Sequence, residues 1–135
     1  MTQRAAPWYS IRKLTPSASA ARGVQAAAEI FIYGDIGESW YEETVSAREF
    51  VEELGELDAD AITVRINSIG GSVPDGIAIR AAMRRHKAQI TTVVDGMALS
   101  VASLIFMGGD VREMGESSVL MIHACLLYTS DAADE

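Results

Sequence analysis

The sequence has only one cysteine, Cys125, so the chain cannot form an internal disulfide bond. It also lacks any run of about 18 apolar residues, the length that a membrane-spanning helix needs. The N-terminus carries arginines but no apolar segment after them, which is not typical of a signal peptide. A single thiol fits a reducing compartment. We therefore expect a cytoplasmic protein with no membrane partner.

Positive charge is scarce in the 135 residues. Lysine and arginine number 11 against 19 aspartates and glutamates, which gives a net charge of −8. Because nucleic-acid binding needs a basic surface, we expect no nucleic-acid partner. The first 27 residues nevertheless hold Arg4, Arg12, Lys13 and Arg22 and no acid. This segment is either a basic arm that docks on an acidic neighbour or a solvated terminus.

Sequence motifs for metal and phosphate chemistry are missing as well. There is no HExxH motif, no cysteine pair and no glycine-rich loop ending in Gly-Lys-Ser/Thr. We therefore expect no metal ion and no cofactor. No serine lies in a G-x-S-x-G motif, which excludes the nucleophile elbow of the α/β-hydrolases.

What the sequence does have is an alternation of strand-like and helix-like segments, in a length that supports one domain with a core. Strands are predicted at residues 29–33, 61–66, 89–94, 111–114 and 119–122. Helices are predicted after a capping box of Ser46 and Glu49, from Pro74 to the basic residues 84–87, and over residues 98–107. The apolar runs in the strands look continuous. We therefore expect an α/β fold with a mainly parallel sheet, buried on both faces and joined by helical crossovers.

Two finer expectations concern the N-terminus and the helix that follows Pro74. Residues 1–27 are expected to form an arm that is mostly irregular, with a short edge strand at residues 8–11. The apolar face of the helix is expected at Ile77, Ile79, Ala82 and Met83.

Three candidate groups for chemistry each follow a predicted strand: the pair Gly70-Gly71, Ser100 and His123. Sites in parallel α/β folds gather at the carboxyl ends of strands. A glycine has no Cβ, so the backbone N–H of Gly71 can face a developing oxyanion. Ser100 at a helix N-terminus benefits from the helix dipole, and the N–H of Val101 is the natural second donor. With His123 as a general base, these groups are the parts of an acyl-transfer site.

Each of these residues also has a purely structural interpretation. In that interpretation, the glycine pair makes only a tight turn, Ser100 serves close helix packing, and His123 is, like many strand histidines, a hydrogen-bonded core or edge residue. The second histidine, His86, lies at a basic helix end, where we expect it to interact with the helix dipole. Asp75 and Asp95 are expected to be turn or capping residues.

Taken together and in this order, the motifs resemble the ClpP-type serine peptidases, in particular the phage and prophage head maturation (prohead) proteases. The resemblance runs from about Trp8 to His123. It is carried by residues 32–37, 64–68, 70–71, 75–79, 84–88 and 94–96, by Ser100 with Ala102-Ser103, and by residues 121–123.

The resemblance implies a ClpP/crotonase-like spiral of ββα units, incomplete at its C-terminus. It also implies that Ser100 is the nucleophile, that His123 is the general base, and that the backbone N–H groups of Gly71 and Val101 form the oxyanion hole. The implied protein is a serine endopeptidase, Clp-like or ATP-independent, that assembles into a homo-oligomeric ring. For the phage branch, the implied substrates are capsid or scaffold proteins in the cytoplasm of the host cell.

The chain departs from this family pattern in several places. Ile69 stands where the family usually has proline, and Leu99 stands where alanine is common. The family's third triad member is an aspartate well beyond the histidine, and no residue here occupies a matching position. Asp131 and Asp134 have the right order but match no family motif.

The last eleven residues, 125–135, do not continue the family pattern and resemble a translated sequencing adapter. We therefore expect an N-terminal arm at residues 1–27, a truncated peptidase domain at residues 28–124 and a non-native tail at residues 125–135. Such a chain is expected to be a weak or inactive catalyst. Two alternatives remain open: a crotonase-type acyl-CoA hydratase or isomerase, and a catalytically degenerate ring subunit.

Overall fold

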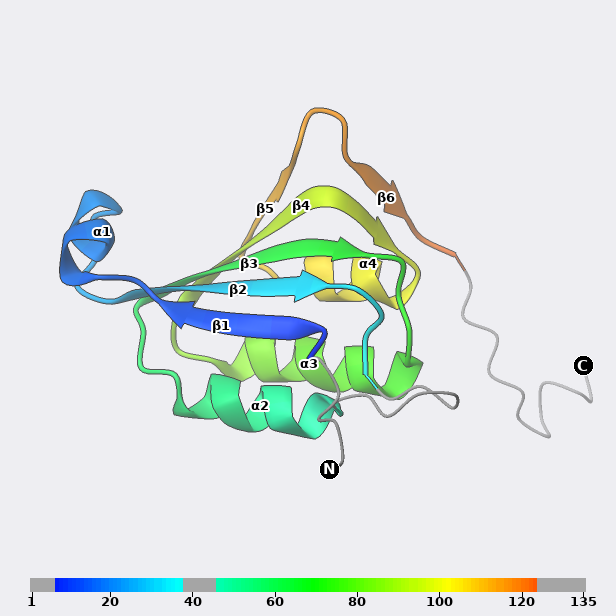
Figure 1. Cartoon of the computed structure of the whole chain (residues 1–135), viewed down its shortest axis with the longest axis horizontal. Coiled ribbons are helices and arrows are strands. Elements are labelled where there is room, and N and C mark those ends of the chain that lie inside the picture. The colour runs from blue at the N-terminus through cyan, green and yellow to red at the C-terminus, as the bar shows by residue number, and fades with distance from the viewer. Residues whose placement is uncertain (1–6, 38–45, 124–135) are drawn as a thin grey trace, which may run out of the picture.

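The structure is a computed structural model that describes residues 7–37 and 46–123. These residues form one sheet in the order β1-β2-β3-β4-β5 (Figure 1). The sixth strand, β6, also pairs with β4, farther along that strand than β5 does. β1 runs antiparallel to β2, and every other pair is parallel. The strands are β1 Tyr9–Lys13, β2 Ala27–Tyr33, β3 Ala61–Ser68, β4 Gln89–Leu99, β5 Val111–Met114 and β6 Val119–Met121. The helices are α1 Pro16–Ala21, α2 Ala47–Glu56, α3 Val73–Arg85 and α4 Val101–Phe106.

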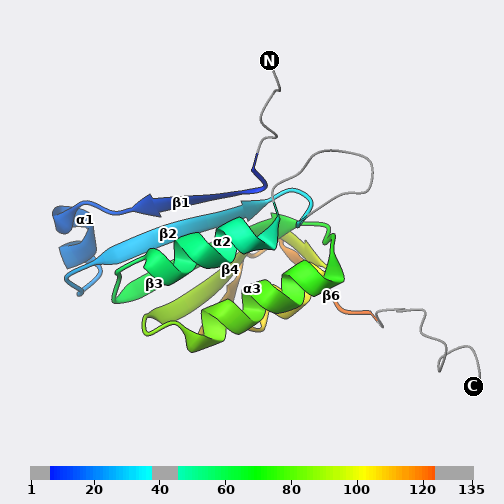
Figure 2. The same cartoon turned by 90° about the horizontal axis from the view of Figure 1, so that it is seen from below.

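Helices cover one face of the sheet, where the core lies. Figure 2 shows α2 and α3 side by side across this face, and α4 packs against α3 and β4. The fully buried side chains between the layers include Ile30, Val64, Phe50, Ile79 and Ile105. The predicted α/β fold with a mainly parallel sheet is therefore correct.

The expectation that the sheet is buried on both faces is wrong. Burial alternates along β3: Ile62, Val64 and Ile66 are buried, whereas the residues between them are only half-buried. Those intervening residues, Thr63 and Arg65, are polar, so the period-two pattern typical of a sheet with one covered face was present in the sequence. The prediction treated this segment as continuously apolar and therefore overlooked the alternation.

The N-terminal segment contains more regular structure than expected. The predicted edge strand is confirmed as β1. Tyr9, its first residue, and Trp8 just before it are buried against the ring of Phe50 in α2, with ring centroids 5.0 and 5.7 Å away. The short helix α1 was not predicted. Its signal is the pair Thr15-Pro16, because Thr15 is the N-cap whose Oγ1 accepts the Ala18 N–H, and a proline follows at the first helical position.

Several boundaries also differ from the predictions. The strand at residues 111–114 is confirmed, but β4 continues five residues beyond Val94, to Leu99, and α4 begins only at Val101. Ile77, expected in the apolar face of α3, is 52 % exposed. Gly76 is buried instead, because α4 approaches α3 at that point: a Cβ atom added to Gly76 would overlap the side chain of Val101.

The contact between Gly76 and Val101 gives a prediction about stability. Gly76→Ala is expected to lower the free energy of unfolding, because overpacking costs about 1–3 kcal/mol and outweighs the gain of up to about 1 kcal/mol in helix propensity. Gly55 in α2 is the matched control, since an added Cβ there meets nothing within 4 Å. Gly55→Ala should raise the free energy of unfolding by about 0.5–1 kcal/mol. Urea unfolding measures both, and equal effects would contradict the close packing of α3 on α4.

Candidate active site

The register between β3 and β4 decides which residues meet at the carboxyl end of the sheet. The strands pair continuously up to Ile66↔Val94 and again at Ser68↔Ala98. Between these pairs, residue 67 alone faces residues 95, 96 and 97, so β4 carries a bulge of two extra residues.

The register after the bulge brings the glycine pair to Ser100. A Cβ atom added to Gly70 would lie 2.9 Å from the Ser100 Cβ, 3.4 Å from its Oγ and 3.0 Å from the Leu99 carbonyl oxygen. A side chain at position 70 would therefore collide with the serine. The structure thus joins two of the sequence-predicted groups, which lie about thirty positions apart in the chain.

Ser100 has an unusual backbone conformation. Its φ of 57° and ψ of −126° make it the one non-glycine residue with positive φ among residues 7–37 and 46–123. Such a conformation costs about 1–3 kcal/mol and is concentrated at functional sites. Ser100 is the N-cap of α4, but its side chain makes no capping hydrogen bond, so the helix does not use the hydroxyl. The serine thus stands between β4 and α4, not inside the predicted helix of residues 98–107.

Three hydrogen bonds fix the backbone of Ser100. Its N–H donates to the carbonyl oxygen of Met121 at 3.1 Å. Its own carbonyl oxygen accepts the Ser103 N–H at 3.0 Å and the Ser103 hydroxyl at 2.5 Å. Ser103 is buried in α4, so these contacts tie the strained residue to the core.

The backbone N–H groups of Gly71 and Val101, the two predicted oxyanion donors, have no backbone acceptor among the described residues. Gly71 forms an isolated parallel bridge with Ile36, in which the Ile36 N–H donates to Gly70 and the Ile36 carbonyl accepts from Ser72. Within the described part of the chain, this pairing leaves the Gly71 N–H without a backbone acceptor. The N–H of Val101, at the first position of α4, likewise has no acceptor one turn earlier in the helix.

Ser68 holds the glycine turn, a role that was not predicted. Its buried hydroxyl donates to the Gly34 carbonyl at 2.6 Å and accepts the Gly70 N–H at 3.1 Å. The turn after β3 is thereby attached to the end of β2. The signal in the sequence is a serine at an inward-facing position, in phase with Ile62, Val64 and Ile66.

The third predicted group, His123, follows β6. This strand pairs in parallel with the end of β4, with Leu99 opposite Met121. Together with the hydrogen bond from Ser100 to Met121, this register brings the end of β6 beside the serine. His123 comes two residues later at an exposed position.

These features follow a known family pattern. The model of the Clp protease family matches residues 17–135. The chain belongs to the Clp protease family. Among curated relatives, ATP-dependent Clp protease proteolytic subunits from Pleurastrum terricola and Deinococcus radiodurans are 36 % and 38 % identical to it. These matches cover 70 % and 60 % of this chain but only 48 % and 43 % of the relatives, so the chain spans about half of their length.

Solved structures of Clp proteases share the fold. ClpP1 from Listeria monocytogenes matches with a TM-score of 0.59 and 28 % identity, over 69 % of this chain and 54 % of that one. The ClpP catalytic domain from Plasmodium falciparum matches with a TM-score of 0.58 and 28 % identity, over 69 % of this chain and 53 % of that one. The described residues of this Clp protease family member therefore correspond to part of the ClpP fold.

His86 lies at the opposite end of β4 from Ser100 and holds a turn. Its Nδ1 accepts the Ala88 N–H at 3.0 Å, and its Nε2 donates to the Leu57 carbonyl oxygen at 3.0 Å. His86 is the C-cap of α3, and its ring connects the loop after α3 with the end of α2.

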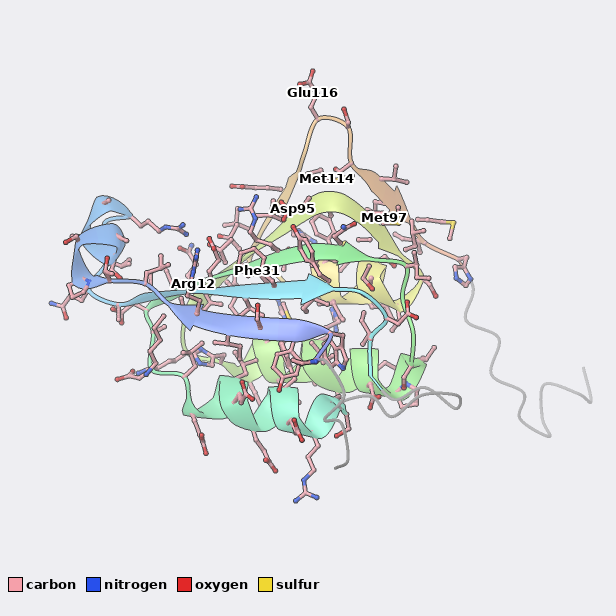
Figure 3. All side chains as sticks on the ribbon, in the orientation of Figure 1. Arg12, Phe31, Asp95, Met97, Met114 and Glu116 are labelled. Atoms are coloured by element: carbon pink, nitrogen blue, oxygen red, sulfur yellow. The ribbon has the colours of Figure 1, made fainter. Side chains whose placement is uncertain are left out.

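Asp95 is not the turn or capping residue that the sequence suggested. It lies in β4 on the sheet face away from α2 and α3 (Figure 3) and accepts two hydrogen bonds from Arg65, at 2.6 and 3.0 Å. The Tyr33 hydroxyl donates to the same carboxylate at 2.5 Å. Partial burial raises the pKa of Asp95, but the hydrogen bonds from Arg65 and Tyr33 outweigh this, so its pKa lies below the ordinary 3.8.

The structure also places the other residues that the sequence singled out. Asp75 lies in the first turn of α3, where its N–H donates to the Ser72 hydroxyl. Ile69 is 60 % exposed and precedes the glycine pair. Asp131, Asp134 and the tail at residues 125–135 lie outside the described residues. No cluster of three or more potential metal ligands occurs within residues 7–37 and 46–123, and no helix there is long and apolar enough to cross a membrane.

The contact between Gly70 and Ser100 can be tested by comparing two glycines with nearly the same φ angle. Gly70 has φ 110° and Gly34 has φ 108°, but an added Cβ at Gly34 meets nothing within 4 Å. Gly34→Ala should lower the free energy of unfolding only by the strain of positive φ, about 1–3 kcal/mol. Gly70→Ala should cost about 1–3 kcal/mol more, because it also collides with Ser100. Equal losses in urea unfolding would show that the glycine turn does not contact the serine.

Proposed function

We propose that this chain is the catalytic part of a Clp-like serine endopeptidase in which Ser100 is the nucleophile. The observation that carries the proposal is the position of Ser100: a strained serine with a hydroxyl that the helix does not use, placed against the glycine turn. Membership of the Clp protease family supports the reaction class.

The proposed chemistry has two halves. His123 takes the proton from the Ser100 hydroxyl as its oxygen bonds to the peptide carbonyl carbon, and the N–H groups of Gly71 and Val101 stabilise the resulting oxyanion. The histidine then gives its proton to the departing amine as the C–N bond breaks, leaving an acyl-enzyme. Water, deprotonated by His123, releases the acyl group and restores the serine.

The triad acid is missing from this proposal. In a serine triad the acid holds the histidine in the correct tautomer, and its removal costs roughly 10⁴ in turnover. The candidates that follow His123 in the right order, Asp131 and Asp134, remain predictions.

Broader aspects of function are proposed on the family match alone. We propose protein substrates and assembly into a homo-oligomeric ring, in which a neighbouring subunit limits access to the serine. The narrower interpretation, processing of phage capsid or scaffold proteins, remains a prediction from the sequence, as does the location in the cytoplasm. The family match favours a peptidase over the acyl-CoA hydratase or isomerase that the sequence left open, whereas a degenerate ring subunit remains the alternative.

Covalent labelling separates an active serine from a degenerate one. A fluorophosphonate probe should attach to Ser100, because it reacts only with an activated hydroxyl. Ser100→Ala should abolish the labelling. Ser118→Ala is the control, since that hydroxyl donates to the Gly115 carbonyl in the turn between β5 and β6. Labelling that survives Ser100→Ala would place the nucleophile elsewhere, and a parent chain that never labels would favour the degenerate subunit.

The two histidines should differ in their effect on peptide cleavage, measured in a form of the protein that cleaves a peptide substrate. His123→Ala should lower kcat by about 10³-fold or more, because triad members act as a unit. His86→Ala should leave kcat per folded molecule within about threefold, while the loss of its two hydrogen bonds lowers the free energy of unfolding by about 1–3 kcal/mol. The assignment of the base is wrong if the two variants show the reverse pattern.

A further inference from the structure

The bulge in β4 lies where the register of the active site is decided. Without the two extra residues, the pairing that ends at Ile66↔Val94 would continue, and Gly70 would face Ala98. Ser100 would then lie two residues farther along the strand, a displacement of about 6–7 Å. The geometry of nucleophile and oxyanion donors therefore depends on the bulge staying in place.

Side chains from the neighbouring strands hold the bulge at both ends. At its start, Asp95 is fixed by the two hydrogen bonds from Arg65 in β3 and by the Tyr33 hydroxyl in β2. At its end, the Met97 N–H donates to the Asn67 side-chain oxygen at 3.2 Å. Asn67 thus replaces the backbone acceptor that the bulge takes away.

Gly96, between these two points, lets the asparagine reach across. A Cβ atom added to Gly96 would lie 2.5 Å from the Asn67 side-chain oxygen, closer than real Cβ contacts come. The glycine, the asparagine and the ion pair are therefore parts of one arrangement on the sheet face opposite the helices.

We propose that Asp95, Arg65 and Asn67 are positioning residues, which hold the bulge so that Ser100 stays against the glycine turn. The proposal rests on the proposed function, because positioning matters only if Ser100 reacts. None of the three forms a hydrogen bond with Ser100 in the described structure, so they act through the register of β4. The pairing of Asp95 with Arg65 is well suited to this, because a bidentate guanidinium–carboxylate contact fixes direction as well as distance.

The chain contains a matched control for the Asp95 ion pair. Glu29 in β2 is also a carboxylate held by guanidinium groups, from Arg12 at 2.6 Å and Arg22 at 3.3 Å, and its side chain is only 8 % exposed, against 20 % for Asp95. It lies near the start of β2, far along the strands from the bulge. Glu29→Gln therefore breaks a more buried ion pair without touching the register of Ser100.

The first measurement is native-state amide hydrogen exchange, which does not depend on activity. Asp95→Asn and the milder Arg65→Lys should each speed exchange at the amides of Met97 and Ser100 by about tenfold or more, with residues 90–94 unchanged. Asn67→Ala should do the same at Met97. Glu29→Gln should leave both amides within about twofold of the parent chain. Unchanged exchange in the Asp95 and Arg65 variants would overturn the positioning role, whether or not the serine reacts.

The second measurement is the rate of fluorophosphonate labelling per folded molecule. Asp95→Asn should slow labelling by about 10-fold to 100-fold, because misplacement of about 1 Å has effects of this size, whereas Glu29→Gln should stay within about twofold. Equal slowing in the two variants would indicate general destabilisation and overturn the proposal. A parent chain that does not label, but shows the expected exchange pattern, would instead refute the proposed function and leave the register role of these residues intact.

Discussion

The close approach of the β3–α3 turn to the β4–α4 junction is the constraint on which the rest of this structure depends. Gly70, with φ 110°, lies against Ser100, which has φ 57°. Strain at the serine of about 1–3 kcal/mol persists only because rigid structure surrounds it. In α4, which follows the serine, the side chains of Val101 and Ile105 are buried, and two hydrogen bonds from Ser103 hold the Ser100 carbonyl group. The core thus supplies the rigidity that a strained serine requires.

Much of the site could be predicted from the order and spacing of residues. The carboxyl ends of parallel strands meet at one edge of a sheet, so groups that follow β3 and β4 were expected together, and the contact between Gly70 and Ser100 confirms this. The expected strand at residues 111–114 is also correct. The reason there is local, since a short segment that contains Val111 is bounded by turns. The chemical roles of Ser100 and His123, in contrast, remain predictions, because a fold does not determine a reaction.

The features that the sequence did not predict are long-range. The segment from Asp95 to Leu99 looked like a turn followed by a helix, because its composition says nothing about the strand with which it pairs. The contacts of Asp95 come from Tyr33 and Arg65, 62 and 30 positions away. Ser68 was overlooked for the same reason, since its partner Gly34 belongs to a different strand.

The polar face of the sheet explains how such a register can be specified at all. A slip by one residue would turn every apolar side chain of β4 to the wrong face, so the core forbids it. A slip by two residues keeps Val94 and Ala98 on the inner face, and the apolar pattern therefore cannot distinguish the observed register from one without the bulge. Only side-chain contacts that require a particular residue at a particular position can distinguish the two registers. Asp95 with Arg65, and Asn67 with the Met97 N–H, are such contacts. On this sheet, the covered face provides stability and the uncovered face selects the register that the active site needs.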